Sequence, residues 1–180
     1  LRADGMTASG QDRDIGATLH ELLLRLYPLC RSLTGEGNRQ TLRILSEELP
    51  ITVSEVPTGT EMFDWTVPDE LSVRSAEIVG PDGIARARFA DRNINLVGYS
   101  VPINAEMSLE DLLPHIVTLP EQEDLVPYAT CYYQRKWGFC MSEREKRSLP
   151  KGRYRVRIDT SLQPGSLSYG EAVLAGSSAS

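Results

Sequence analysis

The hydrophobic pattern of the chain changes its period at Pro50, and this change is the strongest constraint on the fold. Before it, apolar residues recur at intervals of three and four over residues 15–33, which predicts an amphipathic helix. Asp14 is a suitable N-cap, and Pro28 is expected to kink or divide the helix because proline removes a backbone hydrogen bond. A second helix is predicted over about 38–49, ended by Pro50.

After Pro50 the sequence is rich in alternating and β-branched residues, which favours strands. Gly80-Pro81-Asp82-Gly83 is a strong turn signal and predicts a hairpin between the strands on either side. Short helices are predicted from Leu109 and, after a Ser142–Glu145 capping box, from Ser142 to Pro150. The predicted strands are 51–56, 62–67, 73–79, 84–89, 95–101, 128–133, 137–141, 153–159 and 167–174.

These elements predict an α+β chain: a helical pair followed by a β-rich unit with two short helices. The N-terminal residues have the polar composition of a disordered tail. The predicted division is 1–13 disordered tail, 14–50 opening helices, 51–160 β-rich domain and 161–180 a last strand leading out of that domain.

Composition restricts the partners that the chain is expected to have. The 180 residues carry a formal net charge of −6, whereas a polyanion binder needs a surplus of Lys and Arg, so nucleic acid is not expected. No stretch reaches the ~18–20 apolar residues that span a bilayer, and residues 1–16 lack the apolar region of a secretory signal. The cysteines Cys30, Cys131 and Cys140 fit free thiols in a reducing cytoplasm, although Cys131 and Cys140 could face each other across a hairpin.

The sequence offers no catalytic or metal-ligating set. His20 and His115 are its two histidines, and neither belongs to an HExxH or paired Cys/His motif. A Cys140–His115 nucleophile pair has no supporting motif. Residues 33–38 could present helix N–H groups to an anion, but without GxxxxGK[ST] a Gly-rich helix connector is the better interpretation.

The most unusual surface candidate is the run of aromatic and basic residues over 132–139. Aromatic and Arg side chains at a hairpin tip often contact ligands or partners. Tyr133, Arg135 and Trp137 are therefore the predicted substrate or partner contacts. The alternative is that the aromatic residues pack a core while Arg135 and Lys136 form a polar turn.

Several segments in order resemble one family: bacterial proteins with an aminopeptidase-like domain, associated with polysaccharide biosynthesis. These proteins are similar to zinc aminopeptidases that use two metal ions in an α/β core. The likeness covers about residues 15–176. The segments that carry it are residues 29–37 (LCRSLTGEG), 56–60 (VPTGT), 63–68 (FDWTVP), 95–102 (NLVGYSVP), 132–133 with 137–140, and 165–171 (GSLSYGE).

The resemblance implies that residues 14–50 open a peptidase core, that the β-rich part is inserted in it, and that the chain returns to the core near Ser166. It also implies zinc and a peptide or amide substrate in the full-length protein. The family's His- and Asp-containing metal motifs would follow residue 180, so we expect this chain alone to bind no zinc and to be inactive. Within such a protein the inserted part could shape the substrate cleft or serve as a homo-oligomer contact. The alternative function is a self-contained, non-catalytic binding or assembly module.

Overall fold

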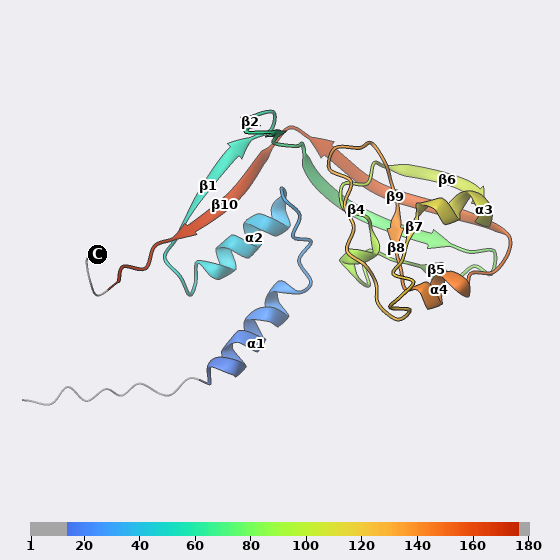
Figure 1. Ribbon diagram of the computed structural model, residues 1–180, viewed down its shortest axis with the longest axis horizontal. Coiled ribbons are helices and arrows are strands. Elements are labelled where there is room, and N and C mark those ends of the chain that lie inside the picture. Colours follow the sequence, from blue (N-terminus) through green and yellow to red (C-terminus); the bar gives the residue numbers. More distant parts are fainter. Residues whose placement is uncertain (1–13, 177–180) are drawn as a thin grey trace, which may run out of the picture.

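A computed structural model describes residues 14–176, which form two lobes joined by long strands (Figure 1). The first lobe holds the helices α1 and α2 and a two-stranded ribbon, and the second holds a four-stranded sheet with short helices against it. The mixture of helices and small sheets confirms the predicted α+β class. The predicted disordered tail, residues 1–13, and the last residues of the predicted return strand, 177–180, lie outside the described residues.

Helix α1 spans Ile15–Leu26, with the Asp14 carboxylate accepting hydrogen bonds from the N–H groups of Gly16 and Ala17. It ends two residues before Pro28, as the proline predicts. Helix α2 spans Glu36–Leu45, so it begins and ends earlier than predicted. It begins early because Gly35, with φ of 101°, lets the chain turn directly into the helix.

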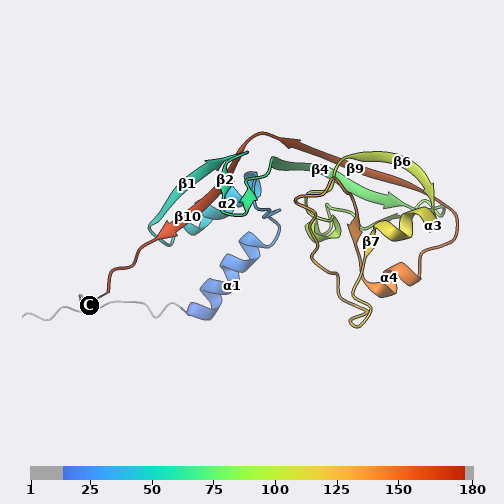
Figure 2. The same cartoon turned by 45° about the horizontal axis from the view of Figure 1, so that its top comes forward.

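The ribbon consists of β1 (Ile51–Pro57) and β10 (Ser166–Ala172), paired antiparallel from Ile51↔Ala172 to Pro57↔Ser166. It lies beside α2 (Figures 1 and 2), where Leu42 packs so close to Gly170 that a Cβ there would be 2.8 Å away. β1, the first strand after Pro50, therefore lies in the first lobe. The predicted boundaries of an inserted domain stay a prediction.

The second lobe contains a sheet of order β5-β4-β9-β6: β5 is Ala85–Arg86, β4 is Glu70–Val79, β9 is Arg153–Gln163 and β6 is Ile103–Ser108. The predicted turn at residues 80–83 connects β4 to β5, with Gly83 at φ of 75°. The alternation in β9 separates exposed arginines from Tyr154, Val156 and Ile158, each at most 2% exposed. These three side chains form the centre of the core with residues such as Ile78, Leu112 and Phe139.

Two further predicted strands differ from the structure. Residues 62–67 do not form one strand but a tight hairpin of β2 (Glu61–Met62) and β3 (Trp65–Thr66), because Phe63 adopts a φ of 53° and reverses the chain. The predicted strand 84–89 is only the two-residue β5, and Ala87 then turns at φ of 47°.

The predicted strands 95–101 and 128–133 are loops. Residues 93–95 form the 3-10 helix η1, the two loops meet through the single bridge Gly98↔Thr130, and another single bridge joins Leu96 to Phe139. In the first loop Leu96, Val97 and Tyr99 are buried by packing rather than in a ladder, which periodicity cannot distinguish, whereas Tyr128 and Tyr133 of the second loop are exposed. Strand β6 was not predicted from the pattern.

The remaining short elements cover the second lobe. The helix predicted from Leu109 is α3 (Leu109–Leu112), continued by the 3-10 helix η2 (Leu113–His115). Strand β7 (Ile116–Val117) pairs in parallel with β8 (Phe139–Cys140). β8 is the part of the predicted strand 137–141 that forms, and it pairs with β7 instead of forming a hairpin with residues 128–133. The capping box at Ser142 is confirmed and opens α4 (Glu143–Arg147).

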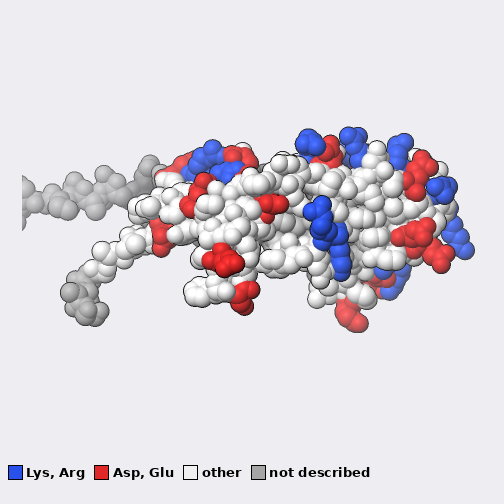
Figure 3. Space-filling view, turned by 90° about the horizontal axis from the view of Figure 1, so that it is seen from above, with Lys and Arg blue, Asp and Glu red and all other residues white. Residues whose placement is uncertain are grey.

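On the face seen in Figure 3, Lys and Arg side chains of the second lobe are interspersed with Asp and Glu. Helix α4 shows the same mixture: Arg144 pairs with Asp124, and Arg147 pairs with Glu123 and Glu143. Within residues 14–176 there is no helix with both the length and the apolar character required to cross a membrane.

Candidate functional site

The connector between α1 and α2 joins the two lobes through a buried hydroxyl. Thr34 is 1% exposed, and its Oγ1 lies 2.6 Å from the Tyr99 hydroxyl of the second lobe. The same Oγ1 accepts the N–H of Leu71 at 3.2 Å. Gly35 is held against the carbonyl of Leu71, where a Cβ would lie 2.7 Å from the oxygen. The Gly-rich segment is therefore a close-packed connector.

A second link between the lobes is ionic. The Arg39 guanidinium of α2 makes a two-point contact with Glu70 at the start of β4, of which the Nη1–Oε2 distance is 3.1 Å. The Arg39 hydrogen bond lowers the pKa of Glu70. Both side chains are about a quarter exposed, at 28% and 24%, so this pair is only partly screened by solvent. Asn38 adds a hydrogen bond of 2.7 Å from Nδ2 to the Ser168 carbonyl of β10.

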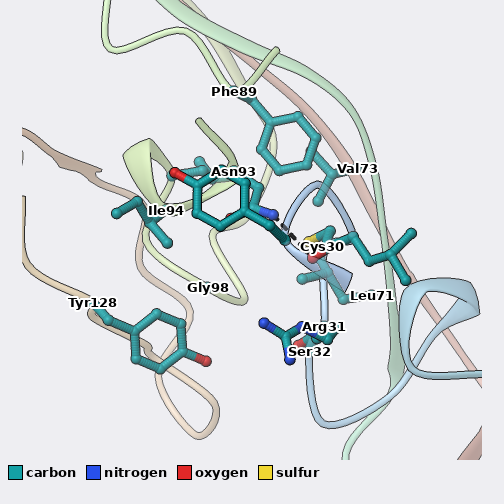
Figure 4. Close-up of a pocket in the computed structure, with 13 residues that line it drawn as sticks. Cys30, Arg31, Ser32, Leu71, Val73, Phe89, Asn93, Ile94, Gly98 and Tyr128 are labelled. Atoms are coloured by element: carbon teal, nitrogen blue, oxygen red, sulfur yellow. Dashed lines mark hydrogen bonds between the residues drawn. The ribbon is translucent and has the colours of Figure 1, made fainter. Parts of the chain in front are cut away.

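The largest cavity described lies at this junction and measures about 360 Å³ (Figure 4). One end is apolar and the other carries polar groups of Arg31, Ser32 and Tyr128. Val73 and Phe89 lie at the apolar end, and Leu71 and Ile94 line the cavity on either side.

A smaller hollow of about 170 Å³ is lined by three tyrosines, Tyr99, Tyr132 and Tyr133, among other residues. The rings of Tyr99 and Tyr132 meet edge to face with centroids 4.7 Å apart. Burial, and then a hydrogen bond with Tyr128, raises the pKa of Tyr132 to about 12, so its hydroxyl stays protonated at neutral pH. Burial likewise raises the pKa of Tyr99.

The three predicted contact residues do not lie together. Tyr133, 68% exposed, and Arg135, also exposed, line the smaller hollow beside Asp69. Trp137 does not line it. Trp137 is half-buried, packs against the core and stacks on His115 with centroids 3.6 Å apart and an angle of 9°. The role of all three in contacting a substrate or partner stays a prediction.

In the part of the chain that the structure describes, the cysteines and histidines form neither a nucleophile pair nor a metal ligand set. Cys140 is fully buried, and burial raises the pKa of its thiol to about 11, which opposes the formation of a thiolate. His115 directs Nδ1 to the Trp137 carbonyl at 3.1 Å, while His20 lies exposed on α1. Over residues 14–176 no three His, Cys, Asp or Glu side chains gather closely enough to hold a metal ion. The described donors therefore do not fit the zinc that the resemblance implies.

The cavity with Arg31 was missed by sequence reasoning. Its polar end combines the connector 29–32 with Tyr128, which are far apart in the chain. The segment Leu29-Cys30-Arg31-Ser32 could have indicated this cavity, since it is one of the segments that carry the family resemblance. It contains no known binding or catalytic motif, however.

Comparison with known proteins places these observations in a family. A Clostridium acetobutylicum protein named "Putative polysaccharide biosynthesis protein with aminopeptidase-like domain" is 38% identical over 163 residues, which are 91% of this chain and 38% of that protein. A crystal structure of a "putative peptidase" from the same organism matches with a TM-score of 0.82 at 38% identity. It covers 87% of this chain and 37% of that chain. This chain thus spans well under half the length of both relatives.

The resemblance seen in the sequence is confirmed by these relatives. The model of one family, described as "Domain of unknown function (DUF2172)", matches residues 70–161. This range runs from the start of β4 to near the end of β9 and contains the second lobe. The chain therefore belongs to the DUF2172 family.

Proposed function

We propose that these residues form the front part of a zinc-dependent aminopeptidase-like hydrolase that acts on a peptide or amide. The names of the two relatives, both at 38% identity, support a peptidase-like hydrolase at the level of the family. Zinc and the substrate class are inferences from the family resemblance.

The uncovered apolar surface of the first lobe carries this proposal. On α1, Leu19 is 54% exposed, Leu23 63% and Leu24 61%, and after β10 Val173 and Leu174 are 84% and 75% exposed. A helix with its apolar stripe in water is not a stable end state, and contiguous exposed apolar surface usually marks an interface. We infer that further polypeptide, corresponding to the longer relatives, covers this surface and completes an α/β core.

The second lobe then has a positioning role. Thr34–Tyr99 and Arg39–Glu70 hold it in a fixed orientation to the helices and the ribbon. A lobe held in this way can form one wall of a substrate cleft whose chemistry is supplied elsewhere. Because no described donor set fits zinc, its ligands would come from polypeptide beyond the described residues.

A non-catalytic binding module is the alternative. It is favoured by the second lobe having its own buried core, with Ile78, Phe139 and Tyr154 each 0% exposed. On this alternative we expect the second lobe to fold without the first. The two proposals differ in what they expect of the apolar face of α1, since a finished module leaves no such face in water.

The decisive experiment uses the longest polypeptide that the coding frame encodes around these residues. We expect purified protein to contain zinc by elemental analysis and to hydrolyse an aminoacyl amide substrate such as leucine 7-amido-4-methylcoumarin. A zinc chelator should abolish this activity, and added zinc should restore it. Protein without zinc, or hydrolysis indifferent to the chelator, would reject the proposal. The 180-residue chain, tested alongside, should be inactive.

A further inference from the structure

We propose that the cavity of about 360 Å³ at the lobe junction binds a small carboxylate with an apolar body, such as the C-terminal residue of a peptide with a branched or aromatic side chain. This inference goes beyond the proposed function and does not depend on it, because binding needs no catalytic group.

The polar end of the cavity is suited to a carboxylate. Arg31 is exposed, and among residues 14–176 it forms no ion pair. The other residues that line the cavity are uncharged, so Arg31 supplies its charge. In Figure 4 its guanidinium lies next to Ser32, and the Tyr128 hydroxyl points toward both from the opposite wall. A guanidinium presents a planar fork of N–H donors that matches a carboxylate, and two hydroxyls can add hydrogen bonds.

The opposite end is suited to an apolar group. Val73 and Phe89 lie there, Leu71 and Ile94 line the sides, and the volume falls within the range of about 300–1,000 Å³ of small-molecule sites. A ligand spanning the cavity would thus remove an aliphatic or aromatic group from water while its charge stays at the rim. An apolar lining with a few polar groups at one end is the usual composition of such sites.

The connector that carries Arg31 is held in place from two sides. The Asn93 amide donates a hydrogen bond of 2.9 Å to the Leu29 carbonyl, from η1 of the second lobe. On the other side, Gly37 of α2 packs on Cys30, where an added Cβ would lie 2.1 Å from the carbonyl oxygen. The backbone around Arg31 is therefore fixed before any ligand arrives, which lowers the ordering cost of binding.

The charge of the site selects the class of anion. One guanidinium balances one negative charge, as a carboxylate carries. A phosphate monoester bears almost two charges and usually recruits several cations or a helix N-terminus. Carboxylates are therefore the expected ligands.

The test measures binding of N-acetyl-L-phenylalanine to the longest polypeptide that the coding frame encodes around these residues, by titration in two-dimensional NMR. We expect saturable binding with a roughly millimolar Kd. The shifted resonances should include Ser32, Ile94 and Gly98, which line the cavity. N-acetyl-L-phenylalanine amide, which lacks the charge, and N-acetylglycine, which lacks the side chain, should each bind about tenfold more weakly or worse.

Variants locate the binding group. Arg31→Gln should weaken binding of the carboxylate about tenfold and leave binding of the amide unchanged. Arg155→Gln removes a charge from an exposed position of β9 that does not line the cavity, and should leave binding unchanged. Unaltered spectra elsewhere show that each variant is folded. The proposal is overturned by equal affinity for acid and amide, by an Arg31→Gln variant that binds as well as the parent, or by no saturable binding.

Discussion

Thr34 Oγ1 and the Tyr99 hydroxyl lie 2.6 Å apart across the junction of the two lobes, and Thr34 is 1% exposed. The same oxygen accepts the N–H of Leu71, so one threonine provides partners for two groups of the second lobe. The orientation of the lobes therefore depends on a hydroxyl that water does not reach.

Replacing Thr34 by valine keeps the shape of the side chain and removes these hydrogen bonds. We expect Thr34→Val to lower the free energy of unfolding by about 1–3 kcal/mol, because two polar groups lose their partner in a buried site. Urea denaturation followed by circular dichroism measures this loss. Thr52→Val, at an exposed position of β1, is the matched control and should change stability by less than about 0.5 kcal/mol. Equal effects of the two substitutions would contradict the assigned role.

Gly16 and Gly37 offer a paired test of close packing near helix starts. In α2, a Cβ on Gly37 would lie 2.1 Å from the Cys30 carbonyl oxygen, whereas on Gly16 of α1 it would meet only the Asp14 carboxylate at 3.2 Å. Alanine normally favours a helix over glycine by about 1 kcal/mol. Gly16→Ala should thus be neutral or stabilising, while Gly37→Ala should destabilise by about 2 kcal/mol despite its better propensity. Thermal unfolding of both variants decides the matter, and a stabilised Gly37→Ala would show that the connector is loosely packed.

Local sequence was enough to predict the helices and β9. The N-cap at Asp14, the stop before Pro28 and the capping box at Ser142 are decided by neighbouring residues, and each was confirmed. Between residues 87 and 141 the chain is held mainly by contacts between distant segments, such as Leu96 with Phe139. Apolar residues there indicate burial and not a strand, so periodicity predicted the wrong elements.

The candidate site was harder to predict for the same reason. Tyr133 and Arg135 lie together at one hollow, but Trp137, only two residues further, stacks on His115. A hairpin would have placed them at one tip, and no hairpin forms here. The cavity near Arg31 needs Tyr128 from a remote loop, which one sequence does not bring together.

Cys140 should make the folded protein less stable at alkaline pH. Its pKa is raised from 9.0 to about 11 by burial, so the folded protein keeps a proton that the unfolded chain releases. Its contribution is complete below pH 9 and is lost as the pH rises from 9 through about 11. The loss is on the order of 2 kcal/mol.

The measurement compares urea unfolding of the parent and Cys140→Ala at several values between pH 8 and pH 11. The variant should be less stable at pH 8, since it leaves a small cavity. Its stability should then fall less steeply with pH than that of the parent. Parallel pH profiles would exclude Cys140 as the source of the dependence.

The exposed stripe of α1 should make the 180-residue chain self-associate. Leu23 is 63% exposed, and a glutamate there would interrupt the apolar surface without disturbing packed residues. We expect Leu23→Glu to shift the mass measured by light scattering toward the monomer, with little loss of stability. Gln122→Glu adds the same charge at an exposed position of the second lobe and should leave the association as it was. If both variants behave alike, net charge and not the stripe controls association.

The two strands that lead into and out of the second lobe are direct neighbours, since Glu70 and Gln163 are cross-strand partners. Everything between them leaves the ribbon and returns to it at one place. Because the two ends of this segment are adjacent, a short linker could replace the whole segment while β1 and β10 keep their register. This geometry allows the region to be exchanged, enlarged or lost during evolution without a change in the polypeptide that flanks it.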